Sequence, residues 1–143
     1  MTDKKFQLRI ITPSETKVDK PVEMVIMRCI DGDWGVMAGH DKRSGVLMDF
    51  GVVRVFDEGN ERRLAAYGGI AEFQDDMLTI LTSEAFWPED IDLARAETDL
   101  EIAKQRLHDK SGKVDEAEVQ MYGVRLRRSL VMIEVSSYPM VGK

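Results

Sequence analysis

The chain has 143 residues and a net charge of −6 at pH 7, with 20 Lys and Arg against 26 Asp and Glu. This length is close to the usual size of one domain and allows a sizeable buried core. The acidic balance argues against binding to a phosphate backbone, so we expect no nucleic-acid partner. No apolar run approaches the roughly 18 residues of a membrane span, so we expect no direct membrane span. The single cysteine cannot form an internal disulfide, which fits a reducing, cytoplasmic compartment.

Residues 1–86 have the pattern of a β-rich domain, because short apolar segments alternate with Gly and Asp clusters. The alternation in 6–10 predicts a half-buried strand, and 22–30 predicts a longer strand followed by a turn at 31–35. Segments 52–67 and 70–82 each predict a β-hairpin. We therefore expect an N-terminal β-sandwich or barrel.

Residues 87–143 change to helical periodicity. A first amphipathic stripe consists of Leu93, Ala96, Leu100, Ala103 and Leu107. Pro88 suits the first turn of this helix, with acidic residues 89, 90 and 92 at the positive end of its dipole.

A second helix is predicted to start at Asp115, which forms a capping-box spacing with Glu118. Its stripe consists of Val119, Tyr122, Leu126, Leu130 and Ile133. A short polar turn at 109–113 makes the pair an antiparallel hairpin, and the tail from residue 136 is expected to fray. The predicted fold class is a mixed β and α protein, with an N-terminal β-sandwich (1–86) and a C-terminal two-helix hairpin (87–143).

The sequence contains no metal-ligand spacing and no nucleophile–base pair, so we expect neither a metal site nor an enzyme. Cys29 lies within an apolar strand pattern, which is typical of core packing rather than of a reactive thiol. His40 follows Gly39 in a loop, where a surface or packing histidine is the usual case. These patterns alone predict a small β-sandwich carrying a helical hairpin, typical of an interaction module.

Four segments occur in a characteristic order over most of the chain. They are Phe6-Gln-Leu-Arg-Ile-Ile-Thr-Pro, Asp31-Gly-Asp-Trp-Gly-Val-Met-Ala-Gly-His40, Tyr67-Gly-Gly and Glu89-Asp-Ile-Asp-Leu-Ala-Arg-Ala96. Together with the β-then-α layout, they resemble the epsilon subunit of bacterial F-type ATP synthases, which is called delta in mitochondria.

The resemblance implies a non-catalytic rotor-stalk subunit without a cofactor, in a proton- or sodium-translocating enzyme. Its sandwich would bind the gamma subunit and the ring of c subunits. Its helices would fold down as a hairpin or extend toward the catalytic alpha and beta subunits and block ATP hydrolysis. The implied location is peripheral, at the cytoplasmic face of the bacterial cell membrane.

The same resemblance implies interface residues in the segment 31–40. Asp33 matches the loop that faces the c ring, His40 matches the loop near gamma, and Trp34 is added for its position beside Asp33. The family usually has a proline on each side of its Gly-His pair, whereas this chain has Ala38 before Gly39 and Asp41-Lys42 after His40. The loss of both prolines is expected to loosen this loop.

An alternative function is regulatory ATP sensing. Asp92, Arg95 and Ala96 match a motif that binds ATP in some members of the family, and Arg125 matches an arginine of the second helix. A carboxylate and a guanidinium three residues apart share one helix face, so they serve equally well as a simple ion pair.

Three positions depart from the pattern of the ATP-binding members. Phe86 stands where binders have an acid, and Ile102 and Ser129 stand where binders have arginines. We therefore expect the chain to bind ATP weakly or not at all.

The second helix also carries an arginine cluster at Arg125, Arg127 and Arg128. Two interpretations are open: the cluster contacts the catalytic subunits in an extended helix, or it forms a solvated basic end.

Overall fold

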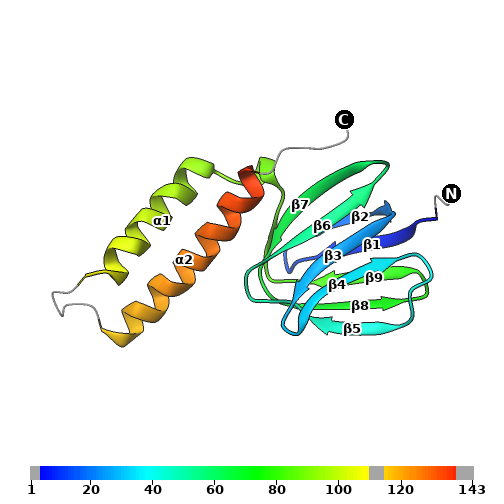
Figure 1. Cartoon of the computed structure of the whole chain (residues 1–143), viewed down its shortest axis with the longest axis horizontal. Helices are drawn as coiled ribbons and strands as arrows, with labels where there is room; N and C mark the ends of the chain where they lie inside the picture. Colours follow the sequence, from blue (N-terminus) through cyan, green and yellow to red (C-terminus); the bar gives the residue numbers. More distant parts are fainter. Residues whose placement is uncertain (1–3, 110–114, 138–143) are drawn as a thin grey trace.

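The computed structural model describes residues 4–109 and 115–137, which form a β-sandwich beside a pair of long helices (Figure 1). The first sheet has five strands in the order β2 (Thr16–Val22), β1 (Phe6–Ile11), β9 (Met77–Leu81), β8 (Ile70–Gln74) and β5 (Arg43–Val46). The second has five in the order β10 (Ala85–Phe86), β7 (Asn60–Ala66), β6 (Gly51–Asp57), β3 (Met24–Cys29) and β4 (Gly32–Met37). The predicted β-sandwich followed by a two-helix hairpin is confirmed.

The core lies between the sheets and is built by alternation along the strands. In β1, Phe6, Leu8 and Ile10 are buried, as the period of two predicts. The two predicted hairpins are β6–β7 and β8–β9. The β8–β9 turn holds both Asp75 and Asp76 at positive φ, as a type I′ hairpin turn requires.

The strand predicted for 22–30 is wrong in its extent. The chain passes from one sheet to the other at Glu23, so β2 ends at Val22 and β3 begins at Met24. A single charged residue within a mostly apolar segment does not by itself signal such a crossing. The missed strand β2 carries mostly polar side chains, with only Val18 and Val22 buried.

The turn predicted for 31–35 is also wrong. The reversal occupies Ile30 and Asp31, and Gly32 opposite Cys29 already belongs to β4. Trp34 and Val36 are buried while Asp33 and Gly35 are exposed, so β4 is an ordinary half-buried strand. Its two glycines and Asp33 concealed this alternation.

Helix α1 (Leu93–Leu107) begins later than predicted. Residues Pro88–Asp90 form a separate 3₁₀ turn, η1. Asp92 caps α1, because its Oδ1 accepts a hydrogen bond from the backbone N–H of Arg95 at 3.1 Å. Pro88 therefore opens η1 rather than α1.

Helix α2 (Glu116–Ser137) starts as predicted after Asp115, whose Oδ1 accepts from the Glu118 N–H at 2.8 Å. Its predicted buried stripe is only partly correct, since Val119 and Leu130 are 46% and 47% exposed while Val131 and Val135 are buried. The reason is that α2 packs on α1 on one side and on η1, β6 and β7 on another.

Residues 110–113 of the turn predicted at 109–113 lie outside the described residues, as does the tail from residue 138. The fraying predicted from residue 136 is wrong for its first two residues, because α2 continues through Ser137. Within the described ranges, no helix is long and apolar enough to cross a membrane.

Candidate functional site

A pocket of about 770 Å³ lies between η1, α1 and α2. It is lined by the four residues that the sequence suggested for nucleotide binding, Asp92, Arg95, Ala96 and Arg125. The first three come from the start of α1 and the fourth from α2. The antiparallel packing of the helices therefore brings together residues that are distant in the chain.

Two guanidinium groups of this pocket carry uncompensated charge. Arg95 and Arg125 make no ion pair with any described residue, and Arg125 lies over the ring of Tyr122 at 5.4 Å. Unpaired guanidinium groups favour phosphate or carboxylate ligands. Asp92 is already engaged at one oxygen by the helix cap.

The remaining polar groups reduce the fit to a polyanion. The carboxylates of Asp90 and Asp99 also line the pocket. Ser129 is buried there and donates its hydroxyl to the carbonyl oxygen of Arg125 at 2.8 Å. Phe86 contributes an apolar wall. Ile102 is exposed and does not line this pocket.

Helix α2 docks on the sandwich through a small apolar cluster. Val131 and Val135 of α2 pack with Val52, Ala65 and Tyr67 of the sandwich. Burial raises the pKa of Tyr67 to about 12, so its hydroxyl stays protonated at neutral pH. This cluster is separate from the main core between the sheets.

Charged groups surround that cluster. Arg128 binds Glu84 at 2.9 Å, and its guanidinium lies over the ring of Tyr67 at 4.9 Å. The Tyr67 hydroxyl donates to the carbonyl oxygen of Arg128 at 3.4 Å. Glu134 lies 3.8 Å from both Arg28 and Arg63. In this docked arrangement Arg128 is thus a sandwich contact and not part of a solvated basic end.

The predicted interface residues do not share one loop. Asp33 is exposed at the start of β4, whereas His40 follows the end of that strand. The Trp34 side chain is only 2% exposed and belongs to the core. Its assignment as an interface residue is therefore corrected, because β4 points it inward and leaves no surface for a partner.

The His40 loop contacts the sandwich through ring packing and a hydrogen bond, although it lacks the flanking prolines. The His40 ring packs edge-on against Trp34 and Phe73, with centroid distances of 5.9 and 5.7 Å. The N–H of Gly39 donates to Asp76 Oδ1 at 2.8 Å. These contacts place the His40 ring against the sandwich, and the loosening expected from the loss of both prolines stays a prediction.

A further surface was missed by the sequence reasoning. Val46, Ile70 and Leu81 lie opposite one another on β5, β8 and β9 and are 47%, 52% and 44% exposed. They form an aliphatic row beside a hollow of about 260 Å³ on the outer face of the first sheet. The three apolar residues are visible in the sequence, but only the strand register shows that they are neighbours on one face of the sheet.

The described residues contain no group of three or more His, Cys, Asp or Glu placed to hold a metal ion. Cys29 is buried, and burial raises its thiol pKa, so it remains a packing residue.

Comparison with known proteins gives concordant matches. A family model described as "ATP synthase, Delta/Epsilon chain, beta-sandwich domain" matches residues 5–88, and its "long alpha-helix domain" counterpart matches 89–135. An ATP synthase epsilon chain from Alkaliphilus oremlandii is 39% identical over 108 residues, covering 76% of this chain and 80% of that one. An ATP synthase epsilon chain from Caldanaerobacter subterraneus is 30% identical over 135 residues, covering 94% of this chain and 96% of that one. A chain in the structure of the Euglena gracilis mitochondrial ATP synthase (OSCP, F1 and c-ring) has a TM-score of 0.78 and 25% identity, covering 94% of this chain and 82% of that one.

Proposed function

Since the chain belongs to the delta/epsilon family of F-type ATP synthases as a non-catalytic subunit, we propose that it links gamma to the c ring in the rotor stalk. We further propose that its two helices restrain ATP hydrolysis by detaching from the sandwich and extending toward the alpha and beta subunits. The chain would work at the cytoplasmic face of the bacterial cell membrane, in a proton- or sodium-driven enzyme.

The observation that carries this proposal is the way the hairpin rests on the sandwich. The contact runs mainly through α2 and combines a small apolar cluster with ion pairs whose side chains are 23–44% exposed. Exposed ion pairs contribute only about 0–1 kcal/mol each. The sandwich keeps its own core between the sheets, so the helices can leave without unfolding it.

The sandwich offers separate surfaces for two partners. Asp33 and His40 lie at opposite ends of β4, which suits contact with the c ring at one end and gamma at the other. The aliphatic row of Val46, Ile70 and Leu81 adds an exposed apolar patch, a feature typical of protein interfaces.

Truncation tests the regulatory part. A chain that ends at Asp90 should fold, because the sandwich has its own core between the sheets, and should still join the complex. The resulting ATP synthase should hydrolyse ATP faster than the complex with the full chain, while synthesis remains coupled. An unfolded truncated chain or an unchanged hydrolysis rate contradicts the two-domain regulatory proposal.

A second candidate function, regulatory ATP sensing, is favoured by one observation. The pocket unites Asp92, Arg95, Ala96 and Arg125, and its two unpaired guanidinium groups could hold phosphate. Each absent arginine removes charge-assisted hydrogen bonds worth about 1.5–3 kcal/mol, or roughly tenfold or more in affinity. Ser129 and Ile102 therefore weaken the site.

Calorimetry with ATP and the purified chain separates these functions. We expect weak or no binding and a hairpin that forms without nucleotide. Micromolar affinity that disappears in Arg95→Ala, but survives in Arg106→Ala outside the pocket, would establish the sensor instead.

A further inference from the structure

The chain remains part of the sandwich beyond its last long strand. Ala85 and Phe86 of β10 pair with Ala66 and Ala65 of β7. Trp87 follows and packs against the main core. The polypeptide that leads to the helices is thus fixed in the second sheet up to residue 87.

The next three residues form a turn with its own hydrogen bonds. The N–H of Asp90 donates to the Trp87 carbonyl at 2.9 Å, and the N–H of Ile91 donates to the Pro88 carbonyl at 3.2 Å. The Trp87 N–H in return donates to Asp90 Oδ2 at 3.2 Å. The turn η1 therefore has a defined shape.

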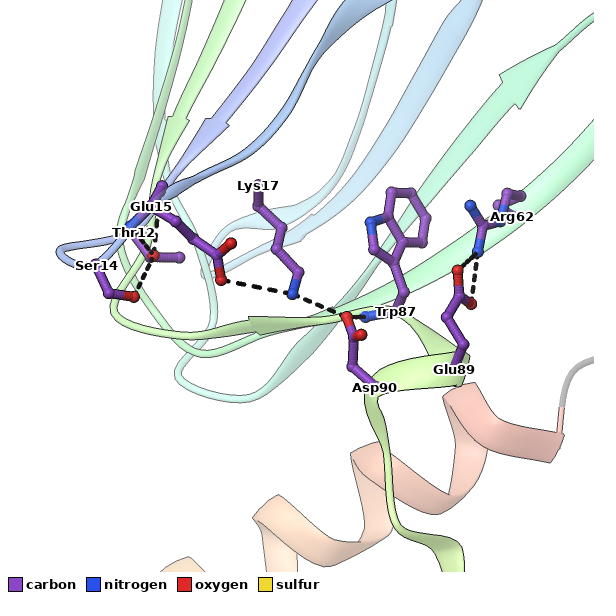
Figure 2. Close-up of polar contacts among 8 residues, drawn as sticks. All are labelled: Thr12, Ser14, Glu15, Lys17, Arg62, Trp87, Glu89 and Asp90. Atoms are coloured by element: carbon purple, nitrogen blue, oxygen red, sulfur yellow. Dashed lines mark hydrogen bonds and ion pairs between the residues drawn. The ribbon is translucent and has the colours of Figure 1, made fainter.

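Two ion pairs attach η1 to both sheets, as Figure 2 shows. Arg62 of β7 holds both carboxylate oxygens of Glu89, at 2.6 and 2.7 Å, and its guanidinium lies 4.1 Å above the Trp87 ring. Lys17 of β2 binds Asp90 at 2.8 Å. Since β7 and β2 belong to opposite sheets, the turn is clamped from two sides.

The following two residues lack such attachment. Among the described residues, the hydrogen bonds of Ile91 and Asp92 run only to η1 and to α1, and none reaches the sheets. Both residues have extended backbone conformations, with φ of −102° and −86°. The Ile91 side chain packs against the apolar cluster beneath α2.

We infer that Ile91–Asp92 is the pivot of the hairpin and that η1 stays with the sandwich when the helices move. This inference rests on the proposed function, because it assumes that the helices detach. It differs from the boundary between the two family domains, which falls between residues 88 and 89, inside the clamp.

Two cross-links in the assembled ATP synthase test the pivot. The first joins Arg62→Cys to Glu89→Cys with a short bis-maleimide and fixes η1 to β7. The second, matched pair joins Glu84→Cys to Arg128→Cys and fixes α2 to the sandwich. Both double variants are first assayed without cross-linker, and Cys29 does not compete because it is 3% exposed.

The 62–89 cross-link should leave ATP hydrolysis unchanged, because the helices still swing from Ile91. The 84–128 cross-link should raise hydrolysis toward the rate of the complex with the truncated chain. If the 62–89 cross-link also raises hydrolysis, η1 moves with the helices and the pivot is wrong, while the proposed inhibition stands. If neither cross-link changes the rate, the helices do not act by detaching, and the proposed function fails together with the pivot.

Discussion

Replacing Arg128 with alanine should shift the helical hairpin away from the sandwich. The substitution removes the ion pair with Glu84 and the stacking over Tyr67, but leaves the buried cluster of Val131 and Val135 intact. Arg125→Ala is the matched control, because Arg125 has the same side chain on the same helix and lies over Tyr122 of that helix.

The magnitude follows from the exposure of the contacts. The two ion-pair partners are 40% and 44% exposed, so solvent screening limits their pair to about 0–1 kcal/mol. An exposed cation–π contact adds about 0.5–1 kcal/mol. Together they predict a loss of roughly 0.5–2 kcal/mol, which moves the docking equilibrium by about two- to thirtyfold.

The assay is a distance measurement on the full chain, with spin labels at Lys20 on β2 and Gln120 on α2, both exposed. The undocked population should grow in Arg128→Ala and stay near the wild-type value in Arg125→Ala. In the complex, the first variant should inhibit ATP hydrolysis more strongly. An unchanged distance distribution in Arg128→Ala would refute the docking role of these contacts.

Three further outcomes are expected. Gly69→Ala should destabilise the sandwich in urea by about 3 kcal/mol or more, because φ is +113° and the new Cβ would overlap the Leu81 carbonyl. The control Gly59→Ala has a positive φ but open space around its Cβ, so it should cost only about 1–2 kcal/mol. Ile70→Ser should weaken assembly with gamma in a pull-down, without changing the fold measured by circular dichroism. A hydrogen bond from Arg62 lowers the pKa of Glu89, so the ionised carboxylate stabilises the fold at neutral pH, and this stabilisation is lost as the pH falls below about 4.5. In urea titrations, the difference in stability between wild type and Glu89→Gln should therefore disappear at such low pH.

The fold class could be predicted because its signals are local. The period of two in β1 and the helical period in α1 are set by which side chains face a core. Both elements form as predicted, although in the α1 stripe only Ala96 and Ala103 are buried and Leu93 is exposed. The crossing at Glu23 could not be predicted in this way, because it depends on which sheet receives the residues before it and which receives those after it. The prediction that Trp34 lies at an interface was wrong for a related reason, because the polar residues beside it concealed a buried position in a strand.

The candidate pocket was partly accessible from the sequence. Helical spacing places Asp92 and Arg95 near each other, but only the packing of α2 on α1 brings Arg125 opposite them. The contact between Arg128 and Glu84 and the row through Ile70 depend on tertiary geometry and strand register. The resemblance to ATP synthase epsilon subunits is confirmed by the family models and relatives.

The parallel pairing of β1 with β9 has a consequence for how the chain folds. Gln7 lies opposite Met77, so the first strand finds its central neighbour only near the end of the sandwich sequence. Such non-local pairing requires costly loop closure and slows folding, whereas a helical hairpin forms through local contacts. During synthesis, the sandwich therefore cannot close until β9 has left the ribosome. The two helices, which follow β9 in the chain, therefore emerge only after the sandwich on which they dock is able to fold.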